Sequence, residues 1–206
     1  MKSIKIVFLS VIFLISCNSS TTNIKFDTGK IESNFYSNDY LGIKLKIDPP
    51  WIILNKEQLE RQMNERKEAI PEANRRSTVE SGVTDLLLSL TIDTIQKMPQ
   101  ILFSSLNLKR DLKIKTETDF LNSLVRQVKQ AYNSYVQITN SDILEEEIGG
   151  KKYHTVLITI KADNFLAYQK EYCIIINSRM LNIMTNYNSE IYSKYCRDLL
   201  SNLEWN

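Results

Sequence analysis

The chain has 206 residues, with 26 Lys and Arg against 24 Asp and Glu, so its formal net charge is +2. Lys2 and Lys5 account for this surplus, because without them 24 basic residues face 24 acidic ones. This balance excludes the overall basic surplus that is typical of nucleic-acid-binding proteins, and no nucleic-acid partner is expected. A single histidine excludes metal sites that need two or three imidazole ligands, including HExxH zinc sites.

The N-terminal segment predicts export and lipid attachment. After the basic start, residues 6–15 are apolar apart from Ser10, a run too short to cross a bilayer but suited to a secretory signal. The tetrapeptide LISC, which ends at Cys17, resembles the bacterial lipobox. We therefore expect residues 1–16 to be a lipoprotein signal peptide and Cys17 to carry diacylglyceryl and palmitate chains. The alternative is an ordinary secreted protein with an incidental cysteine near its cleavage site.

The rest of the chain is predicted to be a tether followed by one domain. Residues 17–39 are rich in Asn, Ser and Thr, which is typical of a flexible linker. Residues 40–206 are enough for a single domain with a sizeable core. The expected location is the cell membrane, through the lipid anchor. Because Asn18 follows the cysteine in place of an aspartate, the outer membrane with the domain facing the periplasm is favoured, if the source is Gram-negative.

Strand patterns come first in the predicted domain, and a helix follows them. Apolar residues alternate with polar or small ones over residues 41–47, which is the period of a half-buried strand, and residues 51–54 form a second apolar run. Asn55 and Gln58 have the spacing of a capping pair and predict a helix over residues 56–70. Residues 71–98 remain undecided, since periodicity alone does not separate helix from strand there.

The middle of the chain predicts one strand and one helix. Residues 100–108, QILFSSLNL, follow a proline and have the composition of a buried strand. Thr116 and Asp119 then form a capping pair, and the apolar residues from Phe120 to Tyr132 make one continuous helix face.

The last third of the chain predicts antiparallel strands followed by a helix. Turn residues at Gly149-Gly150, Asp163-Asn164 and 177–179 separate runs of alternating apolar residues, and an amphipathic helix begins near Ser189. Together these patterns indicate an α+β fold, with a central antiparallel β-sheet flanked by helices.

Several of these segments resemble one known family. GIKLKIDPPWIIL, PQILFSS, IGGKKYHTVLITI and QKEYCIIINSRMLNIMTNYN are similar to segments of PsbP-like (DcrB-like) domains, and LLSNLEW resembles their C-terminal end. The resemblance covers residues 40–206. It implies an α/β/α sandwich used mostly for binding, in a family that includes photosystem accessory proteins, a Ran-binding nuclear-import factor and bacterial lipoproteins. It implies no catalytic residue.

Few residues are candidates for chemistry. His154 shares a strand face with apolar neighbours, which favours a partly covered histidine over a catalytic base. Glu145-Glu146-Glu147 would point to alternating faces of a strand, so a solvated edge is favoured over a metal site. Arg75-Arg76 is expected to be solvated surface. Tyr132, Tyr135, Tyr153, Tyr168 and Tyr172 are expected at the edge of the core, and a few of them are candidates for lining a binding cleft.

Two cysteines remain after lipidation. Cys196 lies on the apolar face of the last predicted helix, and Cys173 lies in a strand that this helix is able to cover. Two buried thiols are favoured, and a Cys173–Cys196 disulfide is the alternative in an oxidising compartment.

The sequence therefore favours a non-catalytic binding or accessory module at the cell envelope, with a protein partner and without cofactor or metal. A lipid or small-molecule carrier with a pocket between sheet and helix is the first alternative. An enzyme with an unrecognised carboxylate or tyrosine site is the second.

Overall fold

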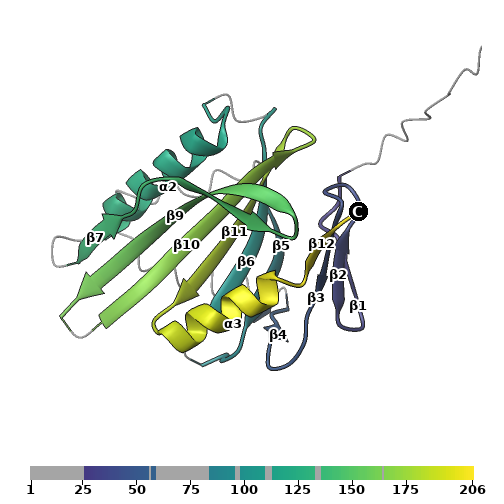
Figure 1. Cartoon of the computed structure of the whole chain (residues 1–206), viewed down its shortest axis with the longest axis horizontal. Helices are drawn as coiled ribbons and strands as arrows, with labels where there is room; N and C mark the ends of the chain where they lie inside the picture. Colours follow the sequence, from purple (N-terminus) through teal and green to yellow (C-terminus); the bar gives the residue numbers. More distant parts are fainter. Residues whose placement is uncertain are drawn as a thin grey trace, which may run out of the picture.

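Two β-sheets and two helices make up the described part of the protein (Figure 1). The computed structural model describes residues 26–55, 57–58, 84–95, 98–109, 113–132, 136–163 and 165–206. The small sheet consists of β1 (Lys30–Glu32), β2 (Phe35–Asn38), β3 (Ile43–Lys46) and β12 (Leu203–Trp205). The large sheet consists of β4 (Ile52–Ile53), β5 (Thr84–Thr91), β6 (Gln100–Asn107), β7 (Gln137–Asn140), β8 (Leu144–Ile148), β9 (Lys151–Ala162), β10 (Phe165–Ile176) and β11 (Arg179–Tyr187). The helices are α2 (Glu117–Ala131) and α3 (Glu190–Leu200).

Every strand pair recorded in the described residues is antiparallel. The large sheet has the order β4-β5-β6-β11-β10-β9-β7, and β8 also pairs with β9. The small sheet has the order β1-β2-β3-β12, so its last strand comes from the C-terminal end of the sequence. The meander predicted from the last third of the chain is confirmed as β9, β10 and β11. Gly149 and Gly150 in the β8–β9 turn both have positive φ, 57° and 78°, which glycine adopts without a steric penalty.

Side chains from the two faces of the large sheet enter two separate cores, because successive strand residues point in opposite directions. Tyr172 belongs to the core under α3 and the small sheet, whereas its neighbour Cys173 belongs to the core under α2. The first core is the larger and includes Tyr36, Ile43, Leu45, Phe103, Tyr153, Ile183, Leu199 and Leu203. The second includes Leu106, Leu121, Val156, Ile158, Ile160 and Met180.

Both helices begin where their capping residues predict. The Thr116 hydroxyl accepts from the Asp119 backbone N–H and the Asp119 carboxylate accepts from the Thr116 backbone N–H, which forms a reciprocal capping box for α2. The Ser189 hydroxyl accepts from the Tyr192 backbone N–H at the start of α3. The predicted pair of Asn55 and Gln58 is also confirmed, with both reciprocal bonds at 2.9 Å. The remainder of the predicted helix at 56–70 lies outside the described residues.

The predicted α+β fold class, a central antiparallel sheet flanked by helices, is wrong. Strands account for 51% of the described residues and form two sheets, against two helices in the same part of the chain. Side chains of the small sheet enter the same core as those of α3, a role that the prediction gave to helices. The error has a physical origin, because β1, β2 and β12 are only three or four residues long and carry no detectable strand period.

The predicted boundaries need two further corrections. The predicted tether, residues 17–39, ends too late, because β1 and β2 belong to the small sheet and Tyr36 is buried in the main core. Within the undecided region 71–98, residues 84–91 form the strand β5, and residues 71–83, 96 and 97 lie outside the described residues. No helix among the described residues has the length and apolar composition needed to cross a bilayer.

Candidate functional site

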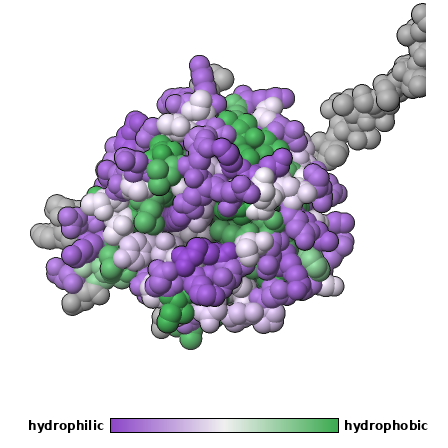
Figure 2. Space-filling view, in the orientation of Figure 1, coloured by the Kyte–Doolittle hydropathy of each residue, from purple (hydrophilic) through white to green (hydrophobic). Residues whose placement is uncertain are grey.

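A cleft with a volume of about 320 Å³ lies between the C-terminal half of β8 and the end of α3. It is lined by Glu146, Glu147, Ile148, Gly149, Tyr172, Arg197, Leu200 and Ser201. The lining therefore combines two carboxylates and one guanidinium with a tyrosine and two aliphatic side chains. Figure 2 shows the face of the protein seen in Figure 1, where hydrophilic residues separate several smaller apolar areas. The cleft mixes charged and apolar side chains and is open to solvent, so it differs from an enclosed, dry apolar cavity.

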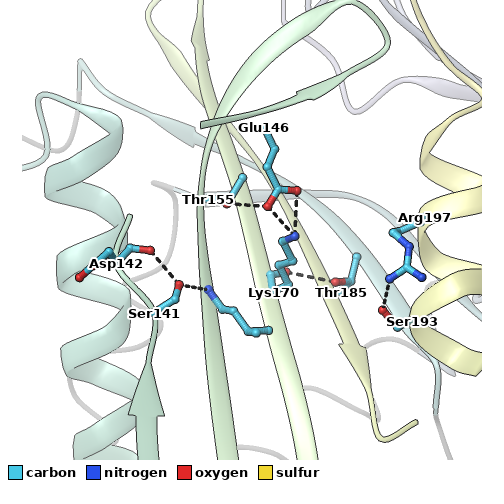
Figure 3. A network of polar contacts seen from close by, with 9 residues as sticks. Ser141, Asp142, Glu146, Thr155, Lys170, Thr185, Ser193 and Arg197 are labelled. Carbon is cyan, nitrogen blue, oxygen red and sulfur yellow. Dashed lines mark hydrogen bonds and ion pairs between the residues drawn. The ribbon is translucent and has the colours of Figure 1, made fainter. Parts of the chain in front are cut away.

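A row of polar side chains crosses the sheet beside this cleft (Figure 3). The Lys170 ammonium from β10 contacts both carboxylate oxygens of Glu146 from β8, at 2.6 and 2.8 Å. The Thr155 hydroxyl from β9 donates to the same carboxylate at 3.4 Å. Thr185 from β11 donates to the backbone carbonyl of Lys170. These bonds fix the direction of the Glu146 carboxylate, because the Lys170 side chain is only 21% exposed.

Arg197 forms the opposite wall of the cleft. It lies one helical turn after Ser193 on α3, and its Nη1 donates to the Ser193 hydroxyl at 2.6 Å. Its Nη2 donates to the Glu190 carboxylate at 2.8 Å. The bond to Glu190 raises the pKa of Arg197 above its ordinary value. Because 54% of the Arg197 side chain and 83% of the Glu190 side chain are exposed, this pair is able to open and leave the guanidinium free for an incoming group.

Tyr172 provides the floor of the cleft. Its side chain is buried, and the Lys170 ammonium lies 5.1 Å from the centre of its ring. Burial raises the pKa of Tyr172 above its ordinary value, and the nearby Glu146 carboxylate adds to this effect. The phenol therefore stays protonated at neutral pH.

The cleft combines paired charges with a buried aromatic ring. Glu146 is paired with Lys170 and Arg197 is paired with Glu190, and tyrosine and arginine side chains are common at the centre of protein interfaces. No group of three His, Cys, Asp or Glu residues able to hold a metal ion is present in the part of the chain that the structure describes.

His154 lies outside the cleft, on the opposite face of β9. Its Nε2 lies 4.0 Å from a Glu145 carboxylate oxygen, and its side chain is 37% exposed. Glu145 also contacts Lys152, at 3.2 Å. Glu145 and Glu146 therefore diverge as strand alternation predicts, but Glu146 is a fixed member of the polar row, whereas the sequence predicted a solvated edge.

The remaining predicted residues have separate positions. Tyr153 is fully buried in the main core, and Tyr132 is 43% exposed at the end of α2. Tyr168 stacks on Tyr187 with ring centres 5.5 Å apart, beyond the polar row on the same strands. Cys17, Arg75, Arg76 and Tyr135 lie outside the described residues.

Cys173 and Cys196 are both free and buried, in cores on opposite faces of the large sheet. The Cys173 thiol donates to the Glu117 backbone carbonyl, with its sulfur 3.7 Å from the oxygen. Burial raises the pKa of Cys196 to about 12 and raises the pKa of Cys173 as well, so both stay protonated at neutral pH. The structure supports the favoured prediction of two buried thiols.

We expect neither thiol to react with Ellman's reagent in the folded protein at pH 8, because only the exposed thiolate is a nucleophile. Both should react after unfolding in urea. The measurement is the release of the coloured thiolate before and after urea is added, together with the intact mass with and without reductant. A mass gain of about 2 Da on reduction would show a disulfide and contradict the free-thiol arrangement.

Sequence reasoning missed two important residues of this site, Lys170 and Arg197. Lys170 is 24 residues from its partner Glu146, and nothing in the local pattern pairs the two. Arg197 is more accessible to prediction, because Ser193 lies four residues before it and Glu190 seven, on one helix face.

Comparison with known proteins adds information on the fold. No protein-family model matches the chain, and no curated protein matches its sequence. Among solved structures, the solution structure of cyanobacterial PsbP (CyanoP) from Synechocystis sp. PCC 6803 is similar, with a TM-score of 0.54. The fold is PsbP-like. The match covers 86% of this chain and 96% of CyanoP at 12% sequence identity, so the resemblance to PsbP-like domains is confirmed at the level of fold alone.

Proposed function

We propose that this protein is a lipid-anchored, non-catalytic binding module of the cell envelope, which contacts a partner protein through the cleft between β8 and α3. The observation that supports this most directly is the Arg197 side chain, held on the rim beside the buried ring of Tyr172. An exposed guanidinium next to an aromatic floor is the kind of anchor that contributes most at protein interfaces. The outer membrane, with the domain facing the periplasm, is the proposed location in a Gram-negative cell.

The cleft also bears on the alternative function, a carrier of lipids or small molecules. A lipid carrier needs an enclosed and largely apolar cavity. The cleft is at the small end of the usual range of ligand sites and carries Glu146, Glu147 and Arg197 on its walls. These charged groups favour a polar partner surface over an acyl chain.

The binding role is tested by photo-crosslinking in the native host, with a crosslinking amino acid at the exposed position Ser201 in the cleft. We expect one discrete crosslinked species, and we expect Arg197→Ala to reduce its yield at least tenfold. The matched control is Arg126→Ala, which removes an exposed arginine from α2 on the opposite face of the sheet. Equal yields in the two arginine variants, with membrane location and stability unchanged, would contradict the role of the cleft.

Lipid anchoring is tested by Cys17→Ala. Loss of the acylated thiol should leave the protein as an unprocessed precursor or release it from the membrane fraction, because two or three acyl chains are what make such anchoring stable. Fractionation followed by intact-mass measurement reports both outcomes. A variant that fractionates and migrates like the parent would show that Cys17 carries no lipid.

A further inference from the structure

Among the described residues, the N-terminal segment contacts the folded domain from Phe26 onward. This is well before residue 40, where the domain was predicted to start. The Phe26 ring lies against the Arg179 guanidinium, 3.4 Å from the ring centre to Cζ, and meets Tyr40 edge-on at 5.3 Å. Immediately after it, the Asp27 carbonyl accepts from the Asn38 side chain at 3.0 Å.

The same contacts show which end of the large sheet receives the incoming chain. Arg179 is the first residue of β11, directly after the β10–β11 turn at Asn177 and Ser178. The Tyr40 hydroxyl donates to the Asn177 carbonyl at 2.7 Å, and the Asn177 side chain donates to the Tyr40 carbonyl at 2.9 Å. The chain therefore enters the domain at the β10–β11 turn.

If Cys17 carries the lipid, the distance from the membrane to this turn is limited by chain length. Nine residue steps separate Cys17 from Phe26, and no backbone spans more than about 3.6 Å per residue, so the upper limit is about 32 Å. The opposite end of the sheet is the β9–β10 turn at Asp163, at the far end of the twelve residues of β10. At about 3.3 Å per residue, this strand separates the two turns by about 40 Å.

From these distances we infer that the β10–β11 turn is the membrane-proximal end of the domain and that the β9–β10 turn is its membrane-distal end. The partner of the proximal end is the lipid bilayer surface. This orientation rests on the lipid anchoring proposed above. It places Phe165 and Leu166, which are 47% and 42% exposed, at the end directed away from the bilayer.

The test uses the full-length lipidated protein in phosphatidylethanolamine–phosphatidylglycerol vesicles that carry a headgroup-linked energy acceptor. A donor dye is attached either through Ser178→Cys or through Asp163→Cys, both at exposed turn positions. The buried Cys173 and Cys196 stay unlabelled in the folded protein. We expect energy transfer from position 178 to be at least twofold more efficient than from position 163. Inserting a sixteen-residue Gly/Ser segment after Ser20 should shrink this difference.

The outcomes separate the orientation from the anchoring. Flotation with the vesicles, loss of flotation in Cys17→Ala and stronger transfer from position 178 support the orientation. Flotation with equal transfer from both positions, or stronger transfer from position 163, overturns the orientation and leaves lipid anchoring intact. Absence of flotation of the parent protein overturns the anchoring and the orientation together.

Discussion

Replacing Gly149 by alanine is expected to lower the free energy of unfolding by about 2–5 kcal/mol. Gly149 has φ +57°, a backbone region that costs a residue with a side chain about 1–2 kcal/mol. In addition, a Cβ at this position would lie 2.2 Å from the Leu203 carbonyl oxygen of β12. The β8–β9 turn must then move away from the small sheet, and such overpacking adds about 1–3 kcal/mol.

Gly150→Ala is the matched control for this prediction. Gly150 also has positive φ, +78°, but a Cβ there meets nothing within 4 Å. Only the conformational penalty of about 1–2 kcal/mol applies to it. Urea unfolding followed by circular dichroism gives both values. Equal losses in the two variants would show that the approach of the turn to Leu203 does not contribute to stability.

Asp85→Asn is expected to lower the free energy of unfolding by about 2–3 kcal/mol, because it leaves the buried Arg179 guanidinium without its counter-charge. The Arg179 side chain is only 7% exposed and contacts the Asp85 carboxylate directly. Its other polar partner is Ser105, whose hydroxyl accepts at 2.7 Å and whose carbonyl accepts at 3.2 Å. The value is below that of a fully buried pair, since the Asp85 side chain is 40% exposed and its asparagine replacement still accepts one hydrogen bond.

Asp198→Asn makes the same chemical change in an exposed pair. Asp198 contacts Lys194 at 2.6 Å, but the two side chains are 57% and 70% exposed. Exposed ion pairs contribute at most about 1 kcal/mol, so a change within about 0.5 kcal/mol is expected. Thermal and urea unfolding of both variants at low ionic strength measure the difference. If Asp85→Asn lowers the free energy of unfolding no more than Asp198→Asn does, the Arg179–Asp85 pair contributes no more to stability than an exposed ion pair.

The parts of the fold that the sequence predicts correctly are those defined by local patterns. Alternation and turn residues locate β9, β10 and β11, and the capping pairs locate the starts of α2 and α3. The small sheet lacks such patterns. All three residues of β1 are exposed, so they show no apolar alternation. Leu203–Trp205 forms the strand β12, but in the sequence it looks like an extension of the apolar face of the preceding helix. Their pairing with β2 and β3 is a tertiary property that a single sequence does not contain.

The candidate site shows the same difference between features set by local patterns and contacts set by the tertiary structure. Strand alternation predicts correctly that Glu145 and Glu146 point to opposite faces. The partners of these residues are not local, because the contact between Glu146 and Lys170 depends on the register of β8 on β9 and of β9 on β10. Arg179 is equally hidden from prediction. It stands at the start of a strongly apolar strand, and the carboxylate that balances it lies 94 residues earlier in the sequence.

The position of β12 sets an order of events during synthesis. β3 spans Ile43–Lys46 and pairs with Leu203–Trp205, and the Asn206 backbone N–H donates to the Gly42 carbonyl at 2.9 Å. Because synthesis proceeds from the N-terminus, β1, β2 and β3 emerge about 160 residues before the strand that closes their sheet. The β9–β10–β11 meander pairs strands that are neighbours in the sequence, and its last strand ends at Tyr187, before β12 begins at Leu203. The small sheet is therefore the last part of the domain to close.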